Sequence, residues 1–309
     1  MMSLVFEWTG REDLNAKGKR FHQVVQNIKI EDLKKTSEQS FSFVGFECQE
    51  GVRRNKGRLG AKEGPNAIRS MLASIPYHVE KENLFDIGNV RCDDENLEDA
   101  QKRLGESVAG IISKQHTPII LGGGHETFYG HYLGVREAIG PDKKIGMINL
   151  DAHFDMRIDE TPSSGTMFRQ ILESDAHAGY LVIGIQELGN TEQLFDTAAQ
   201  LGAQHVKAGE IYPIESTYET IDAFVAAHDV IIYTICTDVI DQSIAPGVSA
   251  PAPFGLDAQT VRNITNYVVQ QEKFVSMDVS EVNPTYDVDN RTSRFIAYVL
   301  AEAISNKNK

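Results

Sequence analysis

The sequence is poor in cysteine, since Cys48, Cys92 and Cys236 are the only three among its 309 residues. Three cysteines at wide spacing provide neither a disulfide framework nor a zinc ribbon. Unpaired cysteines are typical of a reducing compartment, so we expect a cytoplasmic protein. We interpret Cys48 and Cys92 as structural residues.

The chain also lacks an apolar run long enough to span a bilayer. Residues 1–11 lack the basic region and apolar core of a signal peptide, so none is expected. Basic residues are scarce: 30 Lys and Arg stand against 44 Asp and Glu, a formal net charge of −14. Such an acidic chain is not expected to bind nucleic acid or an anionic membrane. With 41% hydrophobic and 24% charged residues, the composition is that of a globular protein.

Short apolar segments alternate with amphipathic ones along the chain. The expected strands are residues 42–46, 84–90, 117–121, 144–150, 180–184, 203–206, 229–235 and 273–277. The expected helices are residues 65–72, 97–114, 126–139, 191–200, 216–227, 257–271 and 289–306. This alternation predicts an α/β protein whose parallel sheet is covered by helices on both faces. Without repeats or linkers, residues 1–309 are predicted to form one domain.

Two features lie outside this alternation. Residues 50–60 are basic and punctuated by glycine, which is typical of a loop. In the polar first forty residues, Trp8 and Phe21 are the expected anchors onto the body of the protein.

A carboxylate, an imidazole and a second carboxylate follow the apolar segment 145–150 at intervals of two residues. They are Asp151, His153 and Asp155. If the backbone stays extended beyond the strand, alternate side chains point the same way and these three converge. Oxygen and imidazole donors together suit Mn, Zn, Fe or Co better than Ca or Mg alone. The alternative is a polar loop with a helix-capping Asp and an unrelated His.

Similar residues follow four of the predicted strands. In an open parallel sheet, ligands bind beyond the carboxyl ends of the strands. The residues at these ends are His125; Asp151, His153 and Asp155; Cys236, Asp238 and Asp241; and Asp278 and Glu281. Because four ends rich in His and Asp would lie on one edge, we predict a metal centre there. Solvated strand ends without a metal are the alternative.

Three motifs together resemble the ureohydrolases, the superfamily of arginase and agmatinase. They are Gly122-Gly123-Gly124-His125-Glu126, Asp151-Ala152-His153-Phe154-Asp155 and Ala245-Pro246-Gly247-Val248-Ser249-Ala250-Pro251. Within this superfamily, residues 54–58, 163–169 and 281–287 resemble the formimidoylglutamase branch, and the similarity extends over essentially the whole chain.

The resemblance implies a three-layer α/β/α sandwich of the arginase type around an eight-stranded parallel sheet. It also implies a binuclear manganese centre that hydrolyses N-formimidoyl-L-glutamate to L-glutamate and formamide in histidine degradation. The paired cations would lower the pKa of a shared water. The expected partner is this small molecule, and the protein is expected to be a homo-oligomer.

Carried over by position, the resemblance implies a set of metal ligands. The first metal would take His125 and Asp155, the second His153 and Asp238, and Asp151 would bridge them. The other bridging position falls on Cys236, where most of the superfamily has Asp. A thiolate is a softer ligand that favours Zn or Fe over Mn, and a protonated thiol would bind weakly. The second metal could then be loose or absent. A packed core cysteine is the alternative for Cys236.

The resemblance also implies catalytic carboxylates. Asp238 would carry a proton from water to the leaving nitrogen. Glu281 would pair with the planar amidinium of the substrate, and a solvated loop acid is its alternative. Ser164 stands where agmatinases carry a His thought to shuttle protons. A hydroxyl can bind substrate but is a poor acid or base near pH 7, which argues against guanidine hydrolysis.

The implied substrate has two carboxylates, which guanidinium groups bind bidentately. The candidates are Arg54, Arg58, Arg157 and Arg169, with Asn55 as an additional amide donor. Arg54 and Arg58 are favoured because they lie in a Gly-rich loop after a strand end. The remaining histidines, including His131, lack a carboxylate at ligand spacing, and we interpret them as surface or core residues.

Two other functions stay open. One is another ureohydrolase, such as a guanidino-acid hydrolase or an agmatinase-like enzyme. The other is a metal-poor, non-catalytic protein of the arginase fold, and Cys236 is its only support.

Overall fold

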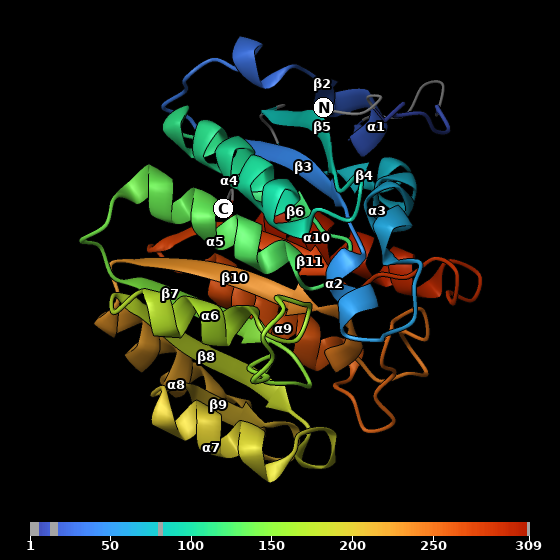
Figure 1. The fold of residues 1–309 in the computed structure, drawn as a ribbon. Helices are drawn as coiled ribbons and strands as arrows, with labels where there is room; N and C mark the ends of the chain where they lie inside the picture. The colour runs from blue at the N-terminus through green and yellow to red at the C-terminus, as the bar shows by residue number, and fades with distance from the viewer. Residues whose placement is uncertain (1–5, 13–17, 80–82, 308–309) are drawn as a thin grey trace.

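The computed structural model describes residues 6–12, 18–79 and 83–307. Its central feature is a parallel sheet that separates two layers of helices (Figure 1). The strand order is β2-β5-β3-β6-β11-β10-β7-β8-β9, and every neighbouring pair is parallel. The strands are β2 (Gln26–Asn27), β3 (Phe41–Glu47), β5 (Leu84–Arg91), β6 (Thr117–Leu121), β7 (Ile145–Leu150), β8 (Ala178–Ile185), β9 (Gln204–Lys207), β10 (Val230–Cys236) and β11 (Phe274–Ser280).

The eight predicted strands are all present in this sheet. A ninth, β2, contributes only 2 residues at one edge. A separate antiparallel pair is formed by β1 (Lys19–Arg20) and β4 (Pro76–Tyr77). The predicted α/β architecture is therefore confirmed.

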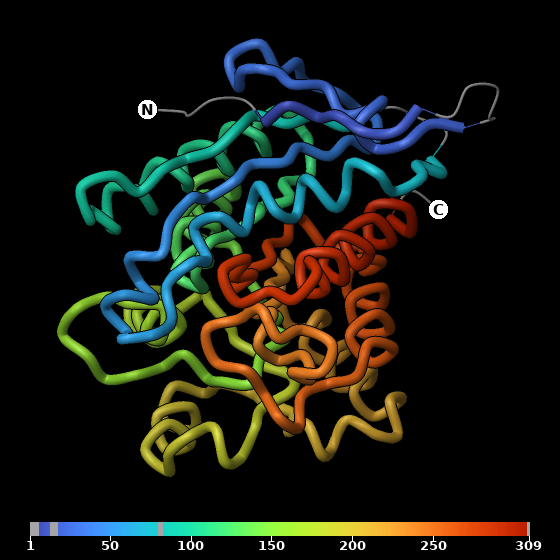
Figure 2. The backbone as a smooth tube through the Cα atoms, turned by 90° about the vertical axis from the view of Figure 1, so that its right-hand side faces the viewer, coloured from blue at the N-terminus to red at the C-terminus, as the bar shows by residue number. Residues whose placement is uncertain are grey.

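Helices cover both faces of the sheet. Their bounds are α1 (Phe21–Val24), α2 (Glu50–Arg54), α3 (Gly64–Ala73), α4 (Leu97–Ser113), α5 (Thr127–Ile139), α6 (Met167–Ser174), α7 (Glu192–Gln200), α8 (Ile214–Ala227), α9 (Ala258–Val269) and α10 (Arg291–Lys307). Side chains of α3, α8, α9 and α10 pack into one hydrophobic core, and those of α4, α5, α6 and α7 into the other. Figure 2 shows the red and orange helices on one side of the sheet and the green ones on the other.

Local sequence explains where several elements begin. All 6 residues of β7 are buried, as expected of an apolar strand in the middle of a parallel sheet. The side chain of Asn96 accepts a hydrogen bond from the backbone of Asp99 and so caps α4. Asp257 caps α9 in the same way, and Pro65 lies in the first turn of α3.

Two local predictions need correction, and the helix α6 was not predicted. Residues 50–60, predicted as a loop, begin with the helix α2, where Arg53 and Arg54 both donate to the Glu50 carboxylate. Helix α6 has only 8 residues, too few for its periodicity to stand out in the sequence. Strand β11 continues past residue 277 to Ser280, so Asp278 lies inside the sheet instead of beyond its edge.

The N-terminal segment is anchored as predicted. Phe21 is fully buried in the core. Trp8 stacks on Phe43 with ring centroids 5.9 Å apart, and its indole nitrogen donates to Asp86 at 2.9 Å.

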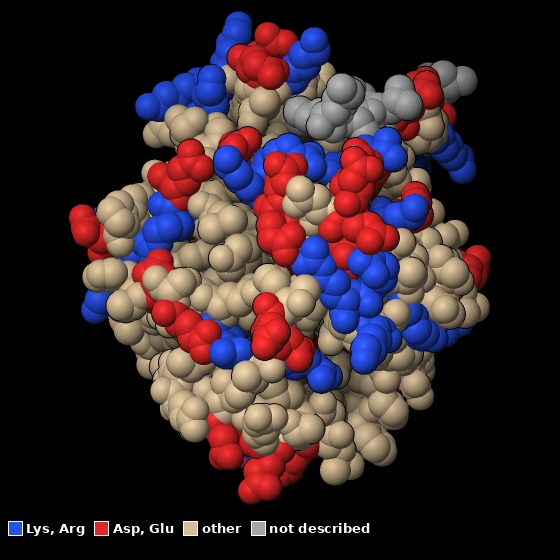
Figure 3. All heavy atoms as spheres, in the orientation of Figure 1, with Lys and Arg blue, Asp and Glu red and all other residues tan. Residues whose placement is uncertain are grey.

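The side of the molecule that α4 to α7 cover carries charged side chains of both signs. Acidic and basic side chains are interspersed there, and both kinds gather near α2 (Figure 3). Of the helices in the described parts of the chain, none has the length and apolar character to cross a bilayer.

Candidate metal centre

Four adjacent strands at the middle of the sheet supply the candidate site. The chain passes from β7 outward to β8 but from β10 back to β11, so the connections that follow these two neighbouring strands leave in opposite directions. The carboxyl edge of an open parallel sheet is hollow at such a reversal. The predicted residues at the ends of β6, β7, β10 and β11 are therefore brought to one place.

His125 lies in the glycine-rich turn between β6 and α5. The turn approaches the backbone of Cys48 so closely that a Cβ on Gly123 would lie 1.8 Å from the Cys48 carbonyl oxygen. The His125 side chain is 1% exposed. Its Nδ1 lies 2.9 Å from Asp155 Oδ2 and 3.1 Å from Asp151 Oδ2. A single imidazole nitrogen thus faces two carboxylates.

The segment after β7 does not stay extended as the sequence analysis assumed. Asp155 has a φ of 51°, in the left-handed region, so the chain turns there. The turn brings Asp155 back onto His125, so the acidic residues still converge. Asp151 is fully buried, its Oδ2 accepts from the Asn149 side chain at 3.0 Å, and its Oδ1 accepts from the His153 backbone at 2.8 Å.

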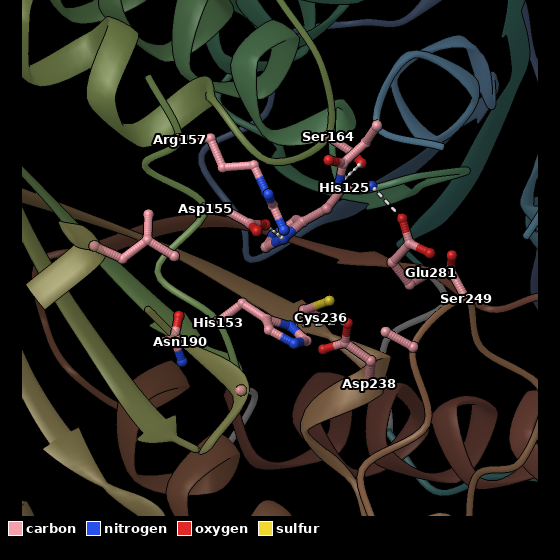
Figure 4. Close-up of a pocket in the computed structure, with 14 residues that line it drawn as sticks. His125, His153, Asp155, Arg157, Ser164, Asn190, Cys236, Asp238, Ser249 and Glu281 are labelled. Atoms are coloured by element: carbon pink, nitrogen blue, oxygen red, sulfur yellow. Dashed lines mark hydrogen bonds and ion pairs between the residues drawn. The ribbon is translucent and has the colours of Figure 1, made fainter. Parts of the chain in front are cut away.

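Two overlapping groups of possible metal ligands result. His125, Asp151 and Cys236 form one group, and Asp151, His153 and Asp238 form the other; ligand atoms within each group lie within 4.8 Å of one another. Asp151 belongs to both, as a bridging carboxylate would. Figure 4 shows the Cys236 sulfur between the two histidine rings, with Asp238 beside it.

Asp241 and Asp278 lie away from these groups, although both were predicted at strand ends. Asp241 accepts from the backbone of Ser243 in a turn. Asp278 is fully buried inside the sheet and bonds to Thr234 and His131.

The acid–base properties of the site follow from burial and crowding. Burial alone would lower the pKa of His125 and His153, but the neighbouring carboxylates outweigh it and raise both well above the ordinary value. Burial would raise the pKa of Asp151, but hydrogen bonds with the histidines lower it. Burial and repulsion by Asp151 raise the pKa of Asp155 to about 6. The Cys236 thiol also has a raised pKa, through burial and the charges of the same acids. In the metal-free protein, bound protons therefore offset part of the negative charge of these acids.

The residues present fit a pair of divalent cations. Imidazole and carboxylate donors are ligand types of Mn, Fe and Zn, and the Cys236 sulfur adds a softer donor that suits Fe or Zn better than Mn. Within the described residues, Asp238 Oδ1 and Glu281 Oε2 are buried polar atoms without a hydrogen-bond partner. Such orphaned atoms are costly unless an ion, a water or a ligand satisfies them.

A cavity of about 110 Å³ opens onto the candidate metal ligands. Its lining includes most of the predicted site together with several uncharged groups: Asn55, His125, His153, Asp155, Arg157, Ser164, Gly189, Asn190, Leu194, Cys236, Asp238, Ser249, Ala250 and Glu281. Asn55 donates to the Ser164 hydroxyl at 3.2 Å, which joins two of the predicted substrate-binding residues. In Figure 4, Glu281 and Asp238 extend into the cavity on the same side as Ser249.

Glu281 is held in a strained conformation. Its φ is 67°, and its Oε1 accepts from the His125 backbone at 3.0 Å. Burial and repulsion by Glu126 raise the pKa of Glu281 well above the usual range. Strained backbone and an unpaired carboxylate oxygen at one residue are typical of a ligand-binding position.

The four candidate arginines lie in different surroundings. Arg54 is held by Glu50 and Glu98, at 2.9 and 2.6 Å, and Arg169 by Glu173 at 2.8 Å. The following contacts hold Arg58: the carbonyl oxygens of Val248 and Ser249, and the ring of Tyr286 at 4.1 Å. Only Arg157 lines the cavity, and no ion pair within the described residues engages its guanidinium. The structure thus places Arg157 at the site and directs Arg54 and Arg58 elsewhere.

Asn190 and Ser249 also line the cavity, although neither was predicted from the sequence. Asn190 follows β8, donates to the carbonyl oxygens of Ala152 and Gln186, and accepts from Phe154. Its position just past a strand could have identified it. Ser249 lies in one of the motifs that carry the family resemblance, but the motif alone assigned it no role.

Fold and site together define an α/β protein with a potential binuclear metal centre at the carboxyl edge of its sheet. The chain belongs to the arginase family, whose model matches residues 39–305. This confirms the superfamily predicted from the motifs.

Two relatives named formimidoylglutamase are similar to this chain over nearly its whole length. A formimidoylglutamase of a Geobacillus species is 45% identical over 304 residues, covering 96% of this chain and 94% of the relative. One from Staphylococcus aureus is 43% identical over 299 residues, covering 95% and 96%.

Among solved structures, the formimidoylglutamase of Bacillus subtilis matches with a TM-score of 0.85 at 22% identity, covering 97% of this chain and 95% of that one, which supports the fold. The Trypanosoma cruzi formiminoglutamase with Mn²⁺ matches with a TM-score of 0.79 at 25% identity, covering 92% and 99%.

Proposed function

We propose that this protein hydrolyses N-formimidoyl-L-glutamate to L-glutamate and formamide, a reaction of histidine degradation. One observation carries the proposal: two candidate ligand groups that share the buried Asp151 present their other members to the cavity that Glu281 lines with its free carboxylate oxygen. Relatives named formimidoylglutamase, about 45% identical over nearly the whole chain, support the choice of substrate.

Manganese is the proposed cofactor, with two ions per chain. The proposed ligands are His125 and Asp155 on one side and His153 and Asp238 on the other, with Asp151 and Cys236 between them. The solved Trypanosoma cruzi relative with Mn²⁺ supports the metal. When bound, paired divalent cations supply hydroxide near neutral pH by lowering the pKa of water.

Glu281 orients the amidine group. With Oε1 held by the His125 backbone, Oε2 remains to accept an N–H of the planar amidinium. A charge-assisted hydrogen bond of this kind favours the cationic amidine and fixes its plane. The carbon that receives the nucleophile would then face the metal ligands.

Asp238 moves the proton. Its Oδ2 lies 3.3 Å from His153 Nδ1, whereas Oδ1 has no partner within the described residues. The free oxygen can take a proton from the attacking water and deliver it to the glutamate nitrogen. The C–O bond to water forms, the C–N bond to glutamate breaks, and the products are a free amine and formamide.

The opposite wall of the cavity binds the carboxylates. Arg157 supplies the positive charge, and Asn55 and Ser164 supply neutral donors. Because Ser164 is a weak acid and base, its role is to donate a hydrogen bond.

We extend the proposal to a homo-oligomer in the cytoplasm. Within the described residues Cys48, Cys92 and Cys236 are free thiols, which supports a reducing compartment. The oligomer rests on the family resemblance and is tested by sedimentation.

The test is turnover of N-formimidoyl-L-glutamate by protein stripped with a chelator and then reloaded with Mn²⁺ under reducing conditions. We expect formamide and glutamate in equal amounts, and only after reloading. A matched guanidino acid serves as the control substrate. Urea from the guanidino acid without formamide from the amidine would establish the other ureohydrolase function. A chain that takes up no metal would establish the non-catalytic alternative.

A further inference from the structure

A chain of buried hydrogen bonds runs behind His125, on the side away from the cavity. His125 Nε2 lies 3.1 Å from the Thr234 hydroxyl, which donates to Asp278 Oδ1 at 2.8 Å. Asp278 Oδ2 lies 2.7 Å from Nδ1 of His131. All four side chains are at most 1% exposed. His131, interpreted from sequence as an ordinary surface or core residue, therefore has a carboxylate partner.

The sheet and one helix build this chain of contacts. Thr234 on β10 and Asp278 on β11 are register partners in neighbouring parallel strands. His131 on α5 packs over them, and α5 directly follows the turn that carries His125. Paired strands and a helix hold side chains more rigidly than the loops around the cavity do.

Elementary hydrogen-bond chemistry fixes the direction of each contact. A carboxylate only accepts, so the Thr234 hydroxyl gives its proton to Asp278. The hydroxyl oxygen is then left to accept from His125 Nε2. A neutral His125 must therefore carry its proton on Nε2 and its lone pair on Nδ1. That lone pair faces Asp151 and Asp155, where a cation between them would meet it.

Asp278 is itself held in place. Besides Thr234, it accepts from the Ser280 hydroxyl at 3.1 Å and from His131. The other ring nitrogen of His131 lies 2.6 Å from the Ser276 hydroxyl, which can donate to it. This leaves the Nδ1 proton of His131 for Asp278. The carboxylate is thus fixed by three donors.

The second histidine ligand has no equivalent support. His153 is 29% exposed, and its Nδ1 lies 3.3 Å from Asp238 and 3.6 Å from Asp151. Its other nitrogen has no hydrogen-bond partner within the described residues. The two sides of the centre therefore differ in rigidity, although both contain an imidazole and Asp151.

We propose that Thr234, Asp278 and His131 are positioning residues that fix His125 as an Nδ1 ligand. As a result, the metal site formed by His125, Asp151 and Cys236 has a higher affinity than the site that contains His153. The inference rests on the binuclear centre of the proposed function. Side chains that orient a metal-binding His in this way typically contribute 10–100-fold to metal affinity.

The experiment is a Mn²⁺ titration of the chelator-stripped full-length chain by calorimetry under reducing conditions, with electron paramagnetic resonance to follow the bound ions. We expect the wild type to bind in a tight step and a weaker step. Thr234→Val removes the hydroxyl at constant shape and should weaken the tight step by about 10–100-fold. The weaker step should change by less than about threefold. Thr234→Ser should restore the tight step.

Thr265→Val is the matched control. Thr265 is buried and its hydroxyl bonds to Tyr233 at 3.0 Å, among the core residues of the other helix layer. We expect both steps to be unchanged in this variant, whatever its thermal stability. If Thr234→Val does not fold, Asp278→Asn provides the same test, because it retains the shape but replaces one accepting oxygen with a donating NH2 group, so the contacts with Thr234 and His131 no longer have a fixed direction.

The outcomes separate the two proposals. A wild type that takes up no Mn²⁺ overturns the proposed function. A wild type that binds normally, with Thr234→Val matching it or weakening both steps equally, overturns the positioning role alone. If Thr234→Val lowers the stability of the protein but leaves its affinity for Mn²⁺ unchanged, the hydrogen bonds stabilise the fold and do not position His125.

Discussion

Replacing Arg157 with glutamine tests which cation receives a carboxylate of the substrate. Arg157 lines the cavity, and no acidic side chain within the described residues pairs with it. Its side chain is exposed, so the substitution removes no buried contact and the fold should be unaffected. The change therefore isolates the interaction of one guanidinium with the ligand.

The expected size follows from the environment of Arg157. A hydrogen bond to a charged group contributes about 1.5–3 kcal/mol, and exposure to solvent reduces this to about 1–2 kcal/mol. Such a loss corresponds to roughly a 5–30-fold decrease in kcat/KM. Because the carboxylates are remote from the reacting carbon, most of it should appear in KM.

The assay compares N-formimidoyl-L-glutamate with the analogue whose side-chain carboxylate is a carboxamide. Arg169→Gln is the control, because Arg169 pairs with Glu173 outside the cavity. The Arg157 variant should lose affinity for the natural substrate, with kcat nearly constant. Unchanged KM in this variant, or an equal loss in Arg169→Gln, would refute the assignment of Arg157 as the carboxylate receptor.

Three further predictions concern the acids and histidines. Glu281→Gln should lower kcat/KM by roughly 10–100-fold while Mn²⁺ uptake stays intact, because a neutral amide pairs less well with an amidinium; loss of metal instead would contradict this role. Mn²⁺ binding at neutral pH should release protons, since carboxylates outweigh burial and raise the pKa of His125 and His153 in the metal-free protein. The affinity for Mn²⁺ should therefore rise with pH. The two raised pKa values stabilise the metal-free protein fully below about pH 6.5, and this stabilisation should be lost as the pH rises through the raised values. Calorimetry in buffers of different ionisation enthalpy measures the release, and identical heats would argue against it. Arg69→Met should cost about 3–5 kcal/mol in urea unfolding, because it leaves Asp86 buried without the cation 2.8 Å away. A loss below about 1 kcal/mol would show that Asp86 is satisfied by other groups.

The ends of β6, β7 and β10, unlike that of β11, were predictable because a strand leaves a local signal. In β7 a run of apolar residues stops at Leu150 and polar ligands follow at once. His125, Asp151 and Asp238 each lie within a few residues of such an end. A rule about parallel sheets then places them on one edge without knowledge of the partners.

The support behind the site was not predictable in this way. His131 and Asp278 are 147 positions apart, and neither has a ligand-like spacing in the chain. Their contact depends on β11 lying between β6 and β10, and on α5 covering that face. The same limit applies to the candidate arginines. From the sequence Arg54 is a candidate to bind a substrate carboxylate, but in the structure its guanidinium pairs with Glu98.

The sequence alone determined the alternation of strands and helices, the family and the positions of the candidate metal ligands, because these depend on patterns within a few residues. The tertiary structure decided the turn at Asp155, which of the four candidate arginines lines the cavity, and the partner of His131. Those features depend on groups that are distant along the chain and meet only when the sheet assembles.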